Sequence, residues 1–132
     1  MKRSVFSTFS YRNDPLGNLY PIIPVSLEFG KIKKEFFALV DSGATISIFH
    51  SEVADSLGIN IPKGKETYLG GVGGRIKGYI HKLKVEIAGK KFLCSIVFSH
   101  EYLVSFNLLG RQEFFKRFRI IFEEKKNRLK LE

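Results

Sequence analysis

Apolar and polar residues alternate along most of the chain, which is the pattern of strands that bury one face. This pattern, together with short apolar runs, predicts strands at residues 25–29, 35–41, 82–87, 91–98, 118–122 and 129–131. Turns rich in glycine or polar residues separate them, at Gly30-Lys31, Ala88-Gly89-Lys90 and Glu124–Asn127. Short strands at this spacing indicate an all-β fold, either a small sandwich or a closed barrel.

Two segments do not alternate and are predicted to be short helices. Residues 51–57 offer Ser51 as the N-cap, acidic Glu52 in the first turn and Gly58 as the stop. Residues 111–117 follow a glycine and form the second predicted helix. An apolar strand, a turn with glycine and a helix thus occur twice, which would suit a fold with a pseudo-twofold repeat.

The N-terminal segment, residues 1–20, is polar and aromatic, with a turn at Asn13–Gly17. An arm, an extra hairpin and partial disorder all remain open for this segment. No low-complexity linker divides the 132 residues, so we expect a single domain over residues 1–132.

Nothing in the sequence predicts a membrane segment or an exported chain. The longest apolar run, Phe36–Val40, is too short to span a membrane, and the N-terminus lacks the apolar region of a signal peptide. Cys94 is the only cysteine, so no disulfide can form within the chain, and its alternating surroundings predict a buried thiol. We therefore expect a cytoplasmic protein without membrane contact.

An excess of basic residues makes nucleic-acid binding a hypothesis to consider. Lys and Arg total 22 against 13 Asp and Glu, a net charge of +9. The basic residues are spread along the chain, however, and many alternate with apolar residues in the predicted strands. This distribution favours a solvated surface over a nucleic-acid interface.

The first candidate for chemistry is Asp41, which ends an apolar strand in the stretch FFALVDSGATISIF, residues 36–49. Burying a carboxylate without a partner is strongly unfavourable, so Asp41 needs either a partner or a function. Gly43 allows a tight turn and a close approach to the backbone, and the Ser42 hydroxyl can bond to another backbone.

The second candidate is the glycine-rich stretch LGGVGGRI, residues 69–76, in which glycines surround Val72. No Gly-Lys-Ser/Thr follows, which argues against a phosphate-binding loop. A floppy turn is one interpretation. A mobile hairpin with an apolar residue at its tip is the other, and such a hairpin could close over an extended ligand.

The third segment is FNLLGR, residues 106–111, an apolar run that leads into Gly110 and Arg111. In this order and at these distances, the three segments resemble the retroviral-type aspartic protease family, the retropepsins and their cellular and prokaryotic relatives. The resemblance spans about residues 22–131. The helix and Leu-Gly-Ile that follow the Asp-Ser-Gly loop are similar to the cellular and microbial branch.

The resemblance implies a small closed β-barrel-like acid-protease fold that is active as a homodimer. Each chain of the family contributes one catalytic aspartate, here Asp41, so the partner of Asp41 would be Asp41 of a second copy. Two carboxylates this close share one proton, and the ionised one activates a water for attack on a peptide carbonyl. The mechanism needs no metal and no cofactor, and we expect neither.

The resemblance also assigns roles around this aspartate. Support of the active-site loop falls to Ser42, Gly43 and Ala44, where Ser42 stands in the place of a family Thr or Ser and would lock the two loops together across the dimer axis. Substrate binding is implied at Gly43, Thr45, Gly70, Gly71 and Val72. Here the main chain of the substrate would be bound as an added strand and covered by the flap-like hairpin.

Side-chain pockets for large apolar residues next to the cut are implied at Leu39, Ile48, Phe106 and Leu108. Plain core packing is the alternative for these residues.

Two features depart from the family's pattern. Retroviral members often have an acidic residue at the position of Thr45, and it pairs with an arginine that Arg111 resembles. That pair cannot form here, so Arg111 needs another partner, for which Glu113 is a candidate. We therefore assign Gly110 and Arg111 structural rather than catalytic roles. The N-terminal extension predicts a dimer interface unlike the retroviral one, formed by residues 128–132 or by the extension itself.

The preferred hypothesis is a homodimeric aspartic endopeptidase that acts on peptides or proteins, and two alternatives stay open. A catalytically silent dimer of the same fold could bind extended peptides, but it would have no reason to keep a buried carboxylate. A basic β-barrel that binds nucleic acid would fit the net charge, but its most distinctive residues would surround Asp41, which repels phosphate.

Overall fold

The computed structural model describes residues 6–71 and 74–132, and most of its regular structure is β-strand. The strands in chain order are β1 (Ser7–Ser10), β2 (Arg12–Asn13), β3 (Leu19–Tyr20), β4 (Ile22–Phe29), β5 (Ile32–Val40), β6 (Ser47–His50), β7 (Lys65–Gly71), β8 (Gly74–Ile87), β9 (Lys90–Ser99), β10 (Asn107–Leu109), β11 (Ile120–Glu123) and β12 (Arg128–Leu131). Helical segments within the described residues are α1 (Ser51–Leu57), η1 (Ile61–Lys63), η2 (Arg111–Phe115) and η3 (Glu124–Lys126). The predicted all-β class with short helices is confirmed.

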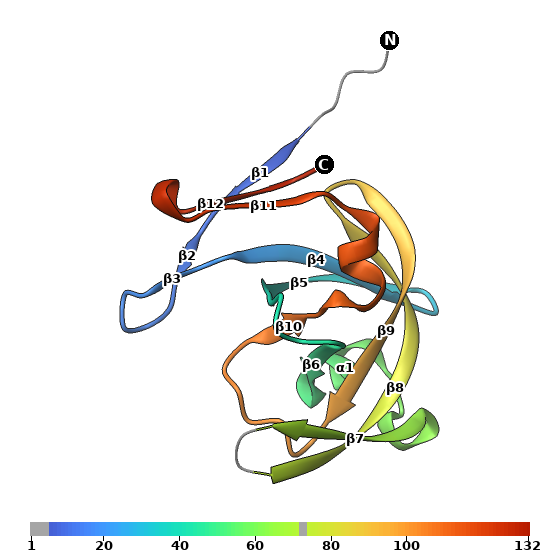
Figure 1. Ribbon diagram of the computed structural model, residues 1–132. Helices are drawn as coiled ribbons and strands as arrows, with labels where there is room; N and C mark the ends of the chain where they lie inside the picture. Colours follow the sequence, from blue (N-terminus) through green and yellow to red (C-terminus); the bar gives the residue numbers. More distant parts are fainter. Residues whose placement is uncertain (1–5, 72–73) are drawn as a thin grey trace.

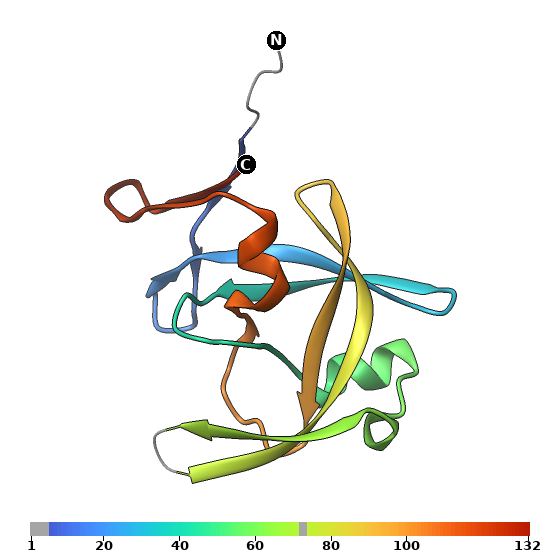
Figure 2. The same ribbon diagram turned by 45° about the vertical axis from the view of Figure 1, so that its right-hand side comes forward.

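The largest sheet has seven strands in the order β4-β5-β10-β6-β9-β8-β7, and β4 also pairs with β8 (Figures 1 and 2). Pairing is antiparallel except between β5 and β10 and between β6 and β9, which run parallel. These parallel pairs place β10 and β6 between β5 and β9, in the middle of the sheet. The end of β5, where Asp41 follows, therefore lies beside the short strand β10.

The alternation seen in the sequence corresponds to alternating burial in the strands. Val25 and Leu27 of β4 are fully buried, whereas Ser26 between them is half-exposed. The β4–β5 turn has Gly30 at φ +59°, and the β8–β9 turn has Ala88 and Gly89 at φ +50° and +79°. Paired left-handed residues give a two-residue turn whose twist matches that of the flanking strands. Both predicted hairpins are confirmed.

A second sheet joins the two ends of the chain, in the order β1-β12-β11. Strand β12 is antiparallel to both of its neighbours, so both of its edges are paired within the chain. The Tyr11 hydroxyl adds a 2.6 Å hydrogen bond to the Glu124 carboxylate. Of the structures left open for the N-terminal segment, the chain adopts a paired strand at β1 and a hairpin at β2–β3.

The β2–β3 hairpin owes its turn to Asp14. One carboxylate oxygen of Asp14 accepts hydrogen bonds from the backbone N–H groups of Leu16, at 3.0 Å, and Asn18, at 2.8 Å. Gly17 takes φ +84°, which glycine adopts without strain. The turn predicted at Asn13–Gly17 is confirmed.

The helix at residues 51–57 is confirmed, but its N-cap is not the predicted one. His50 stands at the cap position and Ser51 is the first helical residue, and no side chain caps the helix. Gly58 ends it in the left-handed conformation, as predicted, with φ +75°. Burial of Val53, Ala54 and Leu57 against the sheet therefore stabilises this helix in place of a side-chain cap.

The helix predicted at residues 111–117 is wrong in its first turn. Gln112 is extended and Glu113 has φ +68°, so the backbone becomes helical only after them. The cause is pairing elsewhere: the N–H groups of Arg111 and Gln112 donate to the carbonyls of Ala44 and Thr45, each at 2.8 Å. These bonds stabilise an extended course that a regular helix could not take.

Cys94 is fully buried on β9, as predicted. Burial, followed by the nearby Glu113 carboxylate, raises the pKa of its thiol to about 12. Among the described residues, no helix has the length and apolar character needed to cross a membrane.

Candidate active site

Asp41 lies at a bend directly after β5, not inside the strand. Its N–H donates to the Leu109 carbonyl of β10, at 3.0 Å, and its carboxylate accepts a hydrogen bond from the Gly43 N–H, at 2.9 Å. The Ala44 N–H closes the bend on the Asp41 carbonyl, at 3.2 Å. The carboxylate is therefore fixed in orientation by the loop that carries it.

The exposure of Asp41 corrects the sequence-based argument. Within a single chain its side chain is half-exposed, and β5 ends one residue earlier, at Val40. Ser42, Gly43 and Thr45 are exposed, and Ala44 is half-buried. One chain thus presents the carboxylate at its surface, and the desolvation inferred from the sequence would require a covering partner.

Three of the predicted pocket residues lie side by side on neighbouring strands. Leu108 of β10 pairs with Leu39 of β5 and with Ile48 of β6. All three are half-exposed, whereas their neighbours along the strands, Val40, Phe49 and Leu109, are buried. Because side chains alternate between the two faces of a sheet, the predicted residues share the face away from the core.

Phe106, the fourth predicted pocket residue, precedes β10 and is half-buried. Its ring centroid is 4.9 Å from that of Tyr20, on the β2–β3 hairpin. On the same hairpin, the Arg12 guanidinium lies 4.1 Å from the Phe37 ring centroid. These contacts hold the hairpin against the strands that flank Asp41.

Gly110 and the backbone of Arg111 connect the turn after β10 to the Asp41 loop. A Cβ at Gly110 would lie 2.5 Å from the Ile46 backbone, so only glycine fits. The Gly110 N–H donates to the hydroxyl of the buried Ser47, at 3.0 Å. The Arg111 side chain, by contrast, is exposed.

Glu113 is not the partner of Arg111. Its carboxylate instead accepts a hydrogen bond from the Ser95 N–H of β9, at 2.5 Å. No ion pair of Arg111 occurs in the part of the chain that the structure describes.

The glycine-rich stretch forms the end of the β7–β8 hairpin. Gly70 pairs with Arg75 and Gly71 with Gly74, so residues 72 and 73 connect the strands. Val72 and Gly73 lie outside the described residues. The hairpin extends on the side of the molecule where β5 ends (Figures 1 and 2).

Two residues near Asp41 were missed by sequence reasoning. Tyr102 is buried, its hydroxyl donates to the Phe106 carbonyl at 2.6 Å, and burial followed by the charge of Asp41 raises its pKa to about 12. Asn107 accepts a hydrogen bond from the His50 N–H, at 2.9 Å, and donates one to the Phe37 carbonyl, at 3.0 Å. Asn107 could have been found from the sequence, because it is the single amide side chain in the apolar run of residues 106–109. Tyr102 lies in a segment without a periodic pattern, so nothing in the sequence indicated its role.

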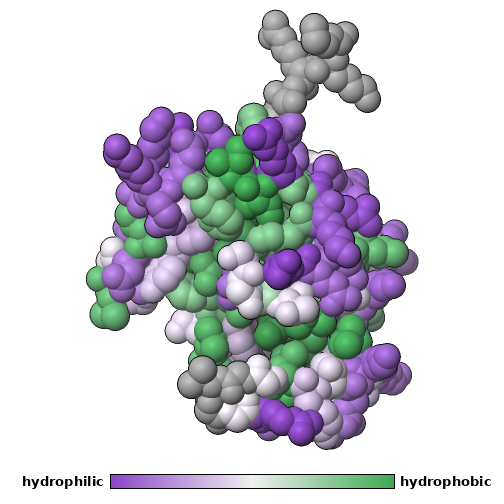
Figure 3. Space-filling view, in the orientation of Figure 1, coloured by the Kyte–Doolittle hydropathy of each residue, from purple (hydrophilic) through white to green (hydrophobic). Residues whose placement is uncertain are grey.

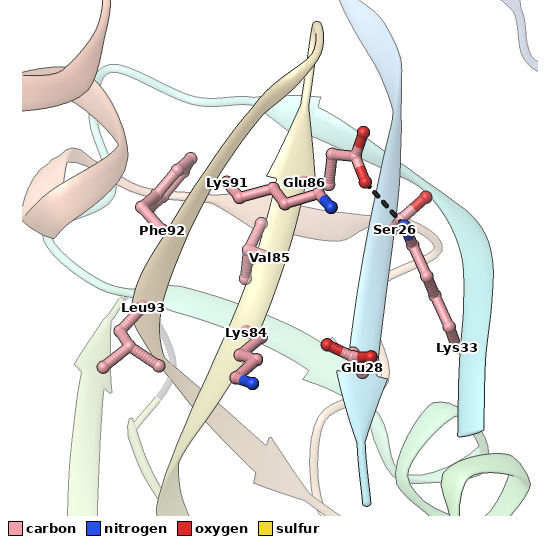
Figure 4. A pocket seen from close by; sticks show the side chains of 9 residues that line it. All are labelled: Ser26, Glu28, Lys33, Lys84, Val85, Glu86, Lys91, Phe92 and Leu93. Carbon is pink, nitrogen blue, oxygen red and sulfur yellow. Dashed lines mark hydrogen bonds and ion pairs between the residues drawn. The ribbon is translucent and has the colours of Figure 1, made fainter. Parts of the chain in front are cut away.

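Two cavities differ in their relation to these residues. One of about 670 Å³ adjoins the Asp41 loop and is lined by Thr45, Arg111, Gln112, Phe115 and Lys116. The other, of about 430 Å³, lies over β4, β5, β8 and β9 and contains none of the predicted site residues (Figure 4). Lys33 and Glu86 form a 2.6 Å ion pair in it, as expected for the solvated face of a sheet.

Comparison with known families identifies the chain. A family model described as aspartyl protease matches residues 23–99, which include the Asp41 loop and the β7–β8 hairpin. The chain belongs to the retroviral-type aspartyl protease family. The chain has the retropepsin fold, similar to that of "EIAV protease complexed with the inhibitor HBY-793", with a TM-score of 0.59 and 19% sequence identity. The similarity covers 74% of this chain and 88% of that chain. A comparison with curated protein sequences gave no match.

Proposed function

We propose that the chain is an aspartic endopeptidase whose active site contains one Asp41 from each of two copies. The observation that carries this proposal is that Asp41 is the only ionisable residue in its loop, fixed by the Gly43 N–H and half-exposed. A single carboxylate cannot act as both general base and general acid in one step. Two copies of the loop, facing each other, supply both groups.

In this dyad the two carboxylates share one proton and titrate as a unit. The ionised Asp41 removes a proton from a water that attacks the peptide carbonyl, while the protonated Asp41 donates to the carbonyl oxygen. The proton then passes to the leaving amine as the peptide bond breaks. The chemistry uses neither metal nor cofactor.

Substrate binding would use the face around the loop. The backbone at Gly43 and Thr45, together with Gly70 and Gly71 of the β7–β8 hairpin, would pair with an extended peptide, with Val72 covering it as the tip of a flap. Side-chain pockets would come from the half-exposed residues Leu39, Ile48, Phe106 and Leu108. Their apolar character favours large apolar substrate residues on either side of the cut.

Loop support and structure are separate roles in this proposal. Ser42, Gly43 and Ala44 shape the loop, and the exposed Ser42 hydroxyl bonds across the dimer axis to the partner's loop. Gly110 and Arg111 have a structural role, because they anchor the turn after β10 to the Ala44 carbonyl.

In the proposed dimer, strand β12 would not pair with a second copy. Strand β12 has no free edge, because β1 and β11 of the same chain occupy both. Apolar side chains are exposed instead on the β2–β3 hairpin and on the β9–β10 connection (Figure 3): Leu16 (86% exposed), Leu19, Leu103 (89% exposed) and Val104. We assign the contacts outside the Asp41 loop to these two segments.

A cleavage assay tests the proposal. An unbiased peptide mixture is incubated with the parent and with Asp41→Asn over a range of acidic to neutral pH, and the products are identified by mass spectrometry. Cleavage by the parent that is lost in the variant supports the proposal. Equal cleavage by both contradicts it, and peptide binding by a stable dimer without any cleavage would indicate the silent binding module.

A further inference from the structure

The cavity beside the Asp41 loop has an unbalanced charge. Two of its lining residues, Arg111 and Lys116, are cationic and exposed, and none is acidic. Thr45 and Gln112 add neutral hydrogen-bonding groups, and Phe115 supplies a half-buried apolar wall. A site with this lining attracts an anionic group on a carbon stem.

The two carboxylates of the adjoining turns, Glu113 and Asp41, have hydrogen-bond partners of their own. Glu113 belongs to the same turn as Arg111, but its carboxylate accepts a hydrogen bond from the Ser95 N–H of β9. Asp41 accepts from the Gly43 N–H within its own loop. Across the described residues, no ion pair includes Arg111 or Lys116. An incoming carboxylate would therefore form charge-assisted hydrogen bonds without displacing an internal partner.

Backbone hydrogen bonds link the cavity to the Asp41 loop. The N–H groups of Arg111 and Gln112 bond to the carbonyls of Ala44 and Thr45, at 2.8 Å each. Gly110 packs so closely on the Ile46 backbone that an added Cβ would not fit at this junction. The cavity wall is thus joined to the loop that carries Asp41 by backbone hydrogen bonds, and Thr45 belongs to both.

We propose that this cavity binds an acidic side chain of the substrate, a few residues from the bond that is cut. The inference rests on the proposed function and specifies its substrate class: peptides with large apolar residues at the cut and Asp or Glu beyond them. Because a homodimer is symmetric, one cavity lies on each side of the dyad, and acidic residues are favoured on both sides.

Matched peptides test the proposal. Each has Phe-Leu at its centre and a single Glu, or Gln in the matched peptide, at one of the second to fifth positions on either side. The parent is expected to show about a tenfold higher kcat/KM for Glu at the best position at low salt, with less preference at high salt. In the double variant Arg111→Glu/Lys116→Glu, the ratio of kcat/KM for Glu over Gln falls by about tenfold or reverses.

A charge-matched control and a binding assay complete the design. Lys31→Glu/Lys63→Glu changes two exposed lysines outside the cavity and is expected to keep the Glu-over-Gln ratio of the parent. Calorimetric titration of the same peptides into Asp41→Asn measures the preference without catalysis, so it still decides the matter if the parent cleaves nothing and the proposed function fails.

Three results would overturn the proposal. The first is equal binding and equal cleavage of Glu and Gln peptides at every position. The second is an unchanged preference in Arg111→Glu/Lys116→Glu. The third is dissociation of the dimer in sedimentation by Arg111→Glu/Lys116→Glu but not by Lys31→Glu/Lys63→Glu, because the cavity would then belong to the contact between copies.

Discussion

Two turns follow neighbouring parallel strands in this protein, and they have opposite properties. The turn after β5 carries Asp41, with exposed Ser42 and Gly43 beside it. The turn after β10 starts at the buried Gly110, which packs against the Ile46 backbone. The first displays chemical groups, and the second holds the first in place through backbone hydrogen bonds to Ala44 and Thr45. Substitutions in the first should therefore change activity, and substitutions in the second should change stability.

The largest expected effect belongs to the displaying turn. Asp41→Asn keeps an oxygen that can accept from the Gly43 N–H, so the free energy of unfolding should stay within about 1 kcal/mol of the parent. Cleavage should fall by about a thousandfold or more, because both carboxylates of the dyad are lost in a dimer of the variant. The measurements are kcat/KM on a cleaved peptide and a urea unfolding curve, and a large loss of stability would show that the turn is also structural.

A matched pair of glycine substitutions contrasts the two turns directly. In Gly110→Ala the added Cβ would lie 2.5 Å from the Ile46 backbone, and we expect a loss of about 2–3 kcal/mol of unfolding free energy. In Gly43→Ala the Cβ would lie 3.3 Å from the Asp41 carboxylate, so stability should change by less than about 1 kcal/mol while cleavage falls. Equal unfolding free energies of the two variants in urea would contradict the assignment of stability to the second turn and activity to the first.

A pair of serine substitutions compares the two turns in the same way, with smaller expected effects. Ser47→Ala leaves the buried Gly110 N–H without its acceptor, which should cost about 1–3 kcal/mol of stability. Ser42→Ala removes an exposed hydroxyl and should leave the unfolding of the single chain unchanged. Sedimentation equilibrium should instead show a weaker dimer for Ser42→Ala. An unchanged dimer would contradict the proposal that the Ser42 hydroxyl bonds to the partner's loop across the dimer axis.

The effect that is smallest at neutral pH concerns Cys94, which lies close to Glu113 of the second turn. Its pKa is raised to about 12, mainly by burial, so the folded state keeps the thiol protonated where the unfolded state ionises it. The free energy of unfolding should therefore be unaffected below the ordinary thiol pKa and fall above it, by at most about 1.4 kcal/mol per pH unit. Urea curves on the alkaline side, compared with Cys94→Ala, measure the slope, and a matching slope in that variant would rule out this cause.

Local patterns in the sequence were sufficient for the β4–β5 and β8–β9 hairpins, the end of α1 at Gly58 and the position of the Asp41 loop. Each depends on residues close together in the chain, such as Gly30 in a turn. The pairing of β1 with β12 depends on contacts between the two ends of the chain, which no local pattern encodes. The irregular turn at Arg111 fails for the same reason, because its backbone bonds to Ala44 and Thr45 override its helical propensity.

The candidate site was predictable in composition but not in exposure. Leu39, Ile48 and Leu108 were identified, and the structure places them together on one face. Asp41 was judged buried because its neighbours are apolar, but the chain bends immediately after Val40 and leaves the carboxylate half-exposed. Tyr102 was missed because the segment before β10 has no periodic pattern.

The central claim, that each active site needs Asp41 from two copies, is tested most directly by mixing. The parent at constant concentration is allowed to exchange subunits with increasing amounts of Asp41→Asn, and the rate of peptide cleavage is measured. Mixed dimers hold one Asp41 instead of two, so the rate should fall steadily towards zero as the variant captures parent chains. A rate that stays constant at every ratio, while sedimentation shows that mixed dimers have formed, would contradict the account.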